Sequence, residues 1–527
     1  MRRPALLSAA LTLAVASVCA GAQESRLPDI GSSAGELATP AQQQRYGSMM
    51  LAQLRQYDYL LEDPLIDDWL DTLGARLVAN SDQPRQPFTF FMLRQRQINA
   101  FATLGGYVGV NAGLVLAAER EDEVAAVMSH EIAHVTQAHV LRAVERAQRD
   151  QLPILLAMLG AIVVAQSAGG NSSDDAAQAV IVSAMGLAQQ RQIDYTRSNE
   201  SEADRVGIRT LARSHYDTQA MAGFFSTLQT RSRTNAANWY GETPDYLRTH
   251  PVTTTRISEA KDLASQMART PQSFAPAAPL GDNPLLPDAF RLGAGSAPSG
   301  GTDQFELARE RLRVLSADTP AAAIAEYERL GKAAALGEAQ RYGLAVARLR
   351  ANQTAAAAKD LEALLERRPG DRWITLALAE AEAQAGQHAK AAERFEALIR
   401  QNPDNRAVAL IYARVLGERN APEAGRRAQA ILRPLLARSA DDAVFQRVFA
   451  RASEIAGDAV RAGEAHAEAA YLNGRPEQAL VQLNTLMKRA ELDYYSRARV
   501  EARIAAITPM VLELKRQGIR DEDLRRR

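Results

Sequence analysis

The sequence HEIAH, residues 130–134, holds two histidines four positions apart, with a glutamate directly after the first. Residues four apart share one face of an α-helix, so the imidazoles of His130 and His134 can reach one ion. Glu131, next to a ligand, is placed to take a proton from water bound there. The pattern predicts a catalytic zinc site for peptide hydrolysis. The alternative is an ordinary helix that happens to contain histidine.

The helix that carries this motif is expected to be long. Residues 119–150 have acidic side chains at the start, basic ones later and apolar ones at helical spacing. In one continuous helix, His139 would lie about half a turn away from His130, because each residue advances about 100°. We therefore expect His139 on the surface, outside the site.

A catalytic zinc ion with two histidines needs another protein ligand and an open position for water. The extended motif that supplies a third histidine is absent, because Val140 stands at that position. The helical segment 194–213 offers Glu200 and Asp204 four apart on one face, with Glu202 turned about 200° away. One carboxylate would bind the ion and the other would accept the second N–H of a ligand histidine. For this segment alone, a helix with solvated acids is the simpler interpretation.

The N-terminus has the pattern of a secretory signal peptide. Two arginines precede an apolar run and the small residues of a cleavage site, so we expect removal of residues 1–22, with cleavage after Ala22. The only cysteine, Cys19, would leave with this segment, and a mature chain without thiols suits an oxidising compartment. A lipid anchor on Cys19 is less favoured, because Val18 is a poor fit to the small residue that lipidation needs.

Composition divides the mature chain into two domains, mainly α-helical. Residues 23–268 combine amphipathic helices with strand-like segments at 88–93 and 105–110. This mixture predicts a zincin-like α+β metallopeptidase domain with a small sheet, whose exposed edge would hold an extended substrate. Residues 269–302, rich in Pro, Gly, Ala and Ser, indicate a linker. Residues 303–527 are alanine-rich and helical throughout.

The C-terminal domain repeats with a period of 34 residues. Pro369 and Pro403 are one period apart, as are Ala345 and Ala379, and the register slips by three residues near Ala440. Small residues where paired helices touch, with proline at the turns, are typical of tetratricopeptide repeats. We expect an α-helical solenoid with a concave surface for protein partners. An alanine-rich bundle without a true repeat is the alternative.

Two apolar stretches, 152–165 and 176–188, lie between the motif and Glu200. Both are short for membrane-spanning helices, and a polar segment separates them. We favour a soluble helical flap over the zinc; shallow membrane contact is the alternative. Lys+Arg and Asp+Glu both number 62, so no overall charge would attract nucleic acid.

HEIAH followed later by ESEAD, residues 200–204, resembles the zinc metallopeptidases related to the CAAX prenyl endopeptidase and the HtpX-type proteases. With a signal peptide and tetratricopeptide repeats, the chain more closely resembles the periplasmic β-barrel assembly-enhancing proteases of Gram-negative bacteria. Residues 98–115 and 247–257 are also similar to family signatures. One departure is Leu104 before Gly105, where proline is common, which concerns the shape of that loop and not the metal site.

The resemblance implies a role for each residue of the motifs. It implies one Zn²⁺ per chain, with the ligands His130, His134 and Glu200. Glu131 would be the general base, and Asp204 would support a ligand histidine.

The resemblance also implies a role for His250, in the segment THPVTTTR. The related envelope protease carries a histidine in a similar His-Pro segment that can occupy the open position of the zinc. Without this likeness, a histidine before proline is usually a loop residue. Two roles stay open for His250: an inhibitory ligand, or a donor to the transition state.

These features together predict a periplasmic zinc endopeptidase, with a chaperone-like activity, for misfolded or stalled outer-membrane proteins. The repeats would bind these proteins and the barrel assembly machinery. The alternative is a non-catalytic tetratricopeptide chaperone or scaffold with a structural metal, but such a site needs neither a base nor an open position. A general degradative secreted protease is a third interpretation, and it predicts no partner domain.

Overall fold

The computed structural model describes residues 38–143, 145–146, 196–237, 246–247, 250–269, 301–489, 492–516 and 518. The expected signal peptide, most of the expected linker and the two apolar stretches at 152–165 and 176–188 lie outside these residues. Within the described ranges, no helix combines the length and the apolar character needed to cross a bilayer.

The N-terminal half consists of helices around one small sheet. Its helices are α3 (Pro40–Gln56), α4 (Pro64–Ala79), α5 (Ala112–Ala117), α6 (Glu121–Thr136), α9 (Ala220–Ala237) and α11 (Thr254–Arg269). Residues 196–213 are also helical, as predicted. The start of α4 follows from its sequence, because the Asp63 side chain caps the backbone N–H of Ile66 and Pro64 occupies the first turn.

The sheet has three strands, β1 (Thr89–Leu93), β2 (Ala100–Thr103) and β3 (Tyr107–Asn111), in the order β1-β3-β2. β3 is parallel to β1 and antiparallel to β2. The predicted strands at 88–93 and 105–110 are confirmed as β1 and β3, whereas β2 was not predicted. A 3₁₀ turn at Leu104–Gly106 joins β2 to β3. β2 is the edge strand next to this turn, so the described sheet has an edge for an extended chain.

The helix that carries HEIAH is shorter than predicted. α6 ends at Thr136, and Ala138 takes a left-handed φ of 53° before helix resumes at residues 139–143. A residue with a Cβ rarely adopts this conformation, and one such residue is enough to end a helix. The prediction of one continuous helix over 119–150 is therefore wrong.

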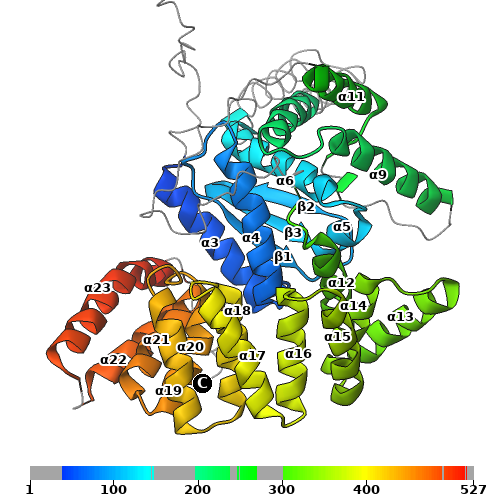
Figure 1. Ribbon diagram of the computed structural model, residues 1–527. Helices are drawn as coiled ribbons and strands as arrows, with labels where there is room; N and C mark the ends of the chain where they lie inside the picture. Colours follow the sequence, from blue (N-terminus) through cyan, green and yellow to red (C-terminus); the bar gives the residue numbers. More distant parts are fainter. Residues whose placement is uncertain are drawn as a thin grey trace, which may run out of the picture.

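The C-terminal half is an array of paired helices (Figure 1). Its helices are α12 (Phe305–Leu315), α13 (Pro320–Ala333), α14 (Glu338–Arg350), α15 (Thr354–Arg367), α16 (Arg372–Gln384), α17 (His388–Gln401), α18 (Arg406–Glu418), α19 (Pro422–Leu432), α20 (Ala443–Ala456), α21 (Ala459–Leu472), α22 (Pro476–Met487) and α23 (Tyr494–Arg516). α14, α16 and α18 start 34 residues apart, which confirms the predicted period. α20 starts 37 residues after α18, beyond a 3₁₀ turn at Arg433–Leu435, which confirms the predicted slip.

The two halves share one hydrophobic core. Trp69 of α4 packs against Phe305 of α12, with ring centroids 6.4 Å apart. The buried cluster to which both belong extends from Leu61 in the first half to Ala465 in the repeats. Figure 1 shows the repeat helices as an arc below the sheet, and α4 contacts both α12 and α18. The repeats therefore complete the core of the N-terminal half.

A buried ion pair crosses this junction. Arg311 donates from Nε and Nη2 to the two carboxylate oxygens of Asp63, both at 2.7 Å. Breaking such a pair leaves an unpaired buried charge, so we expect Arg311→Met to lower the free energy of unfolding by about 3–5 kcal/mol. Arg438, whose pair with Asp404 is exposed, is the matched control: Arg438→Met is expected to cost less than about 1 kcal/mol. Urea denaturation measures both, and equal losses would contradict the prediction.

Candidate metal centre

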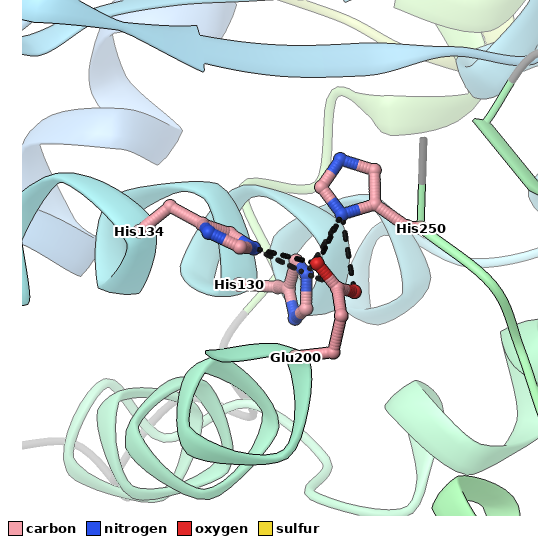
Figure 2. A group of neighbouring side chains, drawn as sticks. All are labelled: His130, His134, Glu200 and His250. Carbon is pink, nitrogen blue, oxygen red and sulfur yellow. Dashed lines mark hydrogen bonds and ion pairs between the residues drawn. The ribbon is translucent and has the colours of Figure 1, made fainter. Parts of the chain in front are cut away.

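Four side chains from three parts of the chain point toward one another (Figure 2). His130 and His134 come from α6, Glu200 from the helix at 196–213, and His250 from the segment before α11. One ligand atom of each residue lies within 4.8 Å of those of the other three. The fold therefore brings the three predicted ligands together and adds His250 to them.

The spacing of these atoms suits a tetrahedral ion. His130 Nε2 lies 3.0 Å from His134 Nε2 and 3.4 Å from His250 Nδ1. Glu200 Oε1 lies 3.3 Å from His134 Nε2 and 3.0 Å from His250 Nδ1. A tetrahedral zinc ion with bonds of about 2.0–2.1 Å keeps its ligand atoms about 3.3 Å apart. The donor set, imidazoles and a carboxylate without sulfur, fits zinc as well.

Small residues bring the two ligand-bearing helices close together. Ala133 of α6 belongs to a buried cluster with Ala203. A Cβ on Gly207 would lie only 3.1 Å from the backbone nitrogen of His130, so the helices could not approach this closely with a larger residue. Gly207 follows Glu200 by seven residues and therefore shares its face of the helix. This close approach places the Glu200 carboxylate at the motif.

Asp204, which the resemblance suggests as support for a ligand histidine, lies next to His130: its Oδ1 is 2.9 Å from His130 Nδ1. Arg256 donates to both Asp204 oxygens, at 2.7 and 2.8 Å, and its Nη1 lies 2.8 Å from Glu200 Oε2. Burial alone would raise the pKa of Asp204, but the bonds with Arg256 and His130 lower it. Arg256 was not predicted from the sequence to take part in the site. The sequence feature that could have pointed to Arg256 was its position in the same segment as His250.

The charges of the cluster favour a cation. Burial would raise the pKa of Glu200, but contacts with three imidazoles hold that pKa far below its usual range. Burial would lower the pKa of His130, yet Asp204 and Glu200 raise it to about 10. The buried carboxylates of Asp204 and Glu200 thus keep His130 protonated, which places a positive charge where the ligand atoms meet. A metal ion that binds there replaces a proton.

Glu131 lies beside the cluster and is only 1% exposed. Its Oε1 has no hydrogen-bond partner among the described residues and lies 3.6 Å from His250 Nε2. A buried carboxylate oxygen without a partner is costly and is usually kept for function. Glu131 therefore has an acceptor available where the predicted base should be.

His250 is not an ordinary loop residue, because it is buried and its Nδ1 faces the cluster. Its backbone N–H donates to the carbonyl of Tyr246 at 2.8 Å, and its ring stacks on the Tyr246 ring with centroids 4.7 Å apart. The contact of Tyr246 with His250 was not predicted from the sequence. These contacts hold the His250 imidazole against the other three side chains of the cluster.

His139 is buried, with 3% of its surface exposed, so the prediction of a surface histidine is wrong. Its Nδ1 lies 2.8 Å from His134 Nδ1, and its Nε2 lies 3.1 Å from Glu202 Oε2. The left-handed conformation of Ala138 redirects the chain after α6. The angular position of His139, which was calculated for a continuous helix, therefore does not apply. Glu202 is absent from the cluster, as predicted, but it reaches His134 through His139.

A cavity of about 370 Å³ opens next to His134. Its walls include Thr103 to Gly105 at the end of the edge strand β2, the α3 residues Gln43 and Gln44, and Val135 of α6. An extended chain that pairs with β2 would pass beside this cavity, which His134 also lines.

Comparisons with known proteins agree with this site. The profile of Peptidase family M48 matches residues 64–264, which include all four residues of the cluster. A tetratricopeptide repeat profile matches residues 348–415. The N-terminal half is thus an M48 peptidase domain, and the array of helices contains tetratricopeptide repeats.

Relatives match longer parts of the chain. A putative beta-barrel assembly-enhancing protease of Vibrio cholerae is 42% identical over 240 residues, 46% of this chain and 48% of that protein. The beta-barrel assembly-enhancing protease of Yersinia pestis is 35% identical over 347 residues, 66% of this chain and 64% of that protein. The chain thus spans about half and just under two thirds of the length of these two relatives.

The protein of that name in Escherichia coli O157:H7 is 32% identical over 373 residues, 70% of this chain and 69% of that protein. This alignment is too long to arise from the peptidase domain alone, which the M48 profile places within residues 64–264. The chain therefore belongs to the family of beta-barrel assembly-enhancing proteases.

Proposed function

We propose that this chain is a zinc-dependent endopeptidase of the bacterial periplasm that degrades misfolded or stalled outer-membrane proteins. The observation that carries the proposal is the meeting of His130, His134 and Glu200 beside Glu131, whose Oε1 accepts no hydrogen bond from the described residues. The names of the relatives support a role in barrel assembly. The signal-peptide pattern of residues 1–22 supports export.

Each residue has a definite part in the reaction. Zinc, when bound, supplies a Lewis acid that polarises both the attacking water and the scissile carbonyl. Glu131 accepts the proton of that water at Oε1 and passes it to the leaving amine. Asp204 and Arg256 orient His130, so that its Nε2 faces the ion. The edge of β2 binds the substrate through its backbone, which gives low sequence specificity.

His250 keeps the enzyme inactive in this conformation. If all four side chains of the cluster, His250 included, held a zinc ion, no ligand position would remain for the water that hydrolysis needs. The same ring also places Nε2 3.6 Å from the Glu131 oxygen that must accept the proton. Substrate or a partner activates the enzyme by stabilising a conformation in which His250 has moved away.

The repeats recruit protein partners and give the chain its chaperone-like activity. Outer-membrane proteins and the barrel assembly machinery are the partners that the names of the relatives suggest. The concave side of a helical array is suited to such contacts, and it carries no chemistry of its own. Contact with the membrane surface would be peripheral.

One observation favours a second function, a scaffold with a structural metal. Four protein ligands around one ion are typical of structural zinc sites. That function, however, gives no role to the buried Glu131 carboxylate beside the cluster. The scaffold also predicts that no substitution of His250 produces proteolysis.

Metal analysis together with a cleavage assay tests the proposed function. The purified mature chain should contain one zinc ion and should cleave an unfolded outer-membrane protein. A chelator should abolish cleavage, and added Zn²⁺ should restore it. A chain that contains zinc but cleaves nothing, even after His250→Ala, would support the scaffold instead.

The ligand role of Glu200 gives a separate prediction. Glu200→Gln removes a charged ligand. Changes to residues that only support a ligand lower metal affinity by up to about 100-fold. Because Glu200 itself would bind the ion, we expect its replacement to lower zinc affinity by at least about 100-fold. Glu259 of α11 is exposed, and Glu259→Gln is the matched control with unchanged affinity. Competition with a chromogenic chelator measures both. Unchanged zinc affinity in Glu200→Gln would remove Glu200 from the ligand set.

A further inference from the structure

A chain of polar contacts leads away from His134, on the side opposite the cluster. His134 Nδ1 lies 2.8 Å from His139 Nδ1, and His139 Nε2 lies 3.1 Å from Glu202 Oε2. Arg142 closes the chain, because its Nη2 donates to Glu202 Oε2 at 2.8 Å. His139 is buried, whereas Glu202 and Arg142 are partly exposed.

The position of each hydrogen follows from the contacts. A neutral imidazole has one N–H donor and one acceptor nitrogen. When Nε2 of His134 faces the ion, its hydrogen must be on Nδ1, and the short contact requires His139 Nδ1 to accept it. The hydrogen of His139 is then on Nε2, where the Glu202 carboxylate accepts it. Every donor in this arrangement meets an acceptor.

We propose that His139 and Glu202 are positioning residues that fix the tautomer and the ring orientation of His134 for the metal. This inference rests on the proposed zinc site. Orientation of a ligand histidine through its second nitrogen commonly changes metal affinity 10- to 100-fold, so the effect should be measurable without any substrate.

The two ligand histidines then have similar supports. His130 contacts Asp204, which is paired with Arg256. His134 is linked in a similar way to Glu202, which is paired with Arg142, but the imidazole of His139 lies between His134 and Glu202. The inserted ring is needed because Glu202 lies two residues after Glu200 and faces away from the cluster, about 200° around the helix.

The left-handed turn at Ala138 makes this arrangement possible. A continuation of α6 would carry position 139 about half a turn away from His130 and out of reach of His134. The break at φ 53° instead turns the His139 ring back toward the motif. An unusual backbone conformation of this kind has a cost, and such conformations cluster at functional sites.

The competing explanation is that His139 only fills the core and pairs with Glu202 for stability. His139→Leu and His139→Asn separate the two explanations. Leucine fills the space but accepts no hydrogen bond, whereas the Oδ1 of asparagine can accept one from His134 Nδ1. A core-filling role predicts that leucine is tolerated better than asparagine, and a positioning role predicts the reverse.

The experiment measures the zinc affinity of each purified variant by competition with a chromogenic chelator, and the thermal unfolding of each metal-free variant. We expect His139→Leu to weaken zinc binding about 10- to 100-fold, and His139→Asn to bind within a few-fold of the parent chain. His466→Leu, the same change at a partly exposed site in α21, should bind zinc as the parent does. Parent-like zinc affinity in His139→Leu overturns the proposal.

Glu202→Ala provides a test even if His139→Leu fails to fold, because Glu202 is partly exposed. It should weaken zinc binding several-fold, and combining it with a change at His139 should add little, because both act through His134. Parent-like affinity in Glu202→Ala, or fully additive losses, contradict the proposal. A parent chain that binds no zinc would instead refute the proposed function, so the two failures are distinguishable.

Discussion

Glu131→Gln is expected to lower kcat/KM for an unfolded outer-membrane protein by about 10²- to 10⁴-fold, the usual loss when a general base is removed. Glutamine has nearly the shape of glutamate but cannot accept a proton under these conditions. Glu131 contributes no atom to the ligand cluster, so zinc binding should not change. Activity should therefore be lost while the metal and the fold are retained.

The measurement is single-turnover cleavage by the purified variant, together with its zinc content and thermal unfolding. Glu259→Gln again serves as the matched control, with unchanged turnover expected. Turnover of Glu131→Gln near that of the parent would contradict the assigned base. Loss of zinc in the same variant would show that Glu131 binds the ion.

His250→Ala is expected to have a large effect in the opposite direction. In the proposed inactive conformation, His250 occupies a ligand position of the ion. If the active conformation is populated at about 10% or less, removal of the His250 side chain should raise basal proteolysis at least about tenfold. Self-cleavage should rise as well. Zinc should remain bound through His130, His134 and Glu200, because these three ligands are sufficient for a catalytic site.

The opposite sign would identify a different role for His250. A transition-state donor at this position predicts a fall of about 10²- to 10³-fold with zinc retained. His215→Asn is the control for a general effect of removing a histidine, because His215 is exposed. Its φ of 64° is left-handed, a conformation that asparagine tolerates, so the substitution should not disturb the backbone. Cleavage of a flexible peptide by purified protein measures all three chains.

The sequence allowed prediction of features that depend on local periodicity. The spacing of His130 and His134 puts them on one face of any helix, and the same argument pairs Glu200 with Asp204. The predicted 34-residue period recurs in the starts of α14, α16 and α18, and the predicted slip recurs in the start of α20. Each of these relations depends on residues that are close in the sequence, so it does not change with the tertiary packing.

Features that depend on tertiary structure were not predictable in this way. The phase of His139 failed because Ala138, which favours helix, takes a left-handed conformation. Arg256 was missed because its partners Asp204 and Glu200 lie 50 or more residues away in the sequence, and a lone arginine carries no periodic signal. β2 was missed because four residues are too few to establish alternation.

The core shared by α4 and α12 links the stability of the metal centre to occupancy of the repeats. Because one buried cluster extends through both halves, they are expected to unfold together. A ligand that binds only the folded chain at 100 times its Kd then adds about 2.7 kcal/mol to the free energy of unfolding of the whole molecule. A client held by the repeats would thus reduce the fraction of unfolded enzyme about 100-fold, and with it the supply of enzyme molecules that active copies can digest.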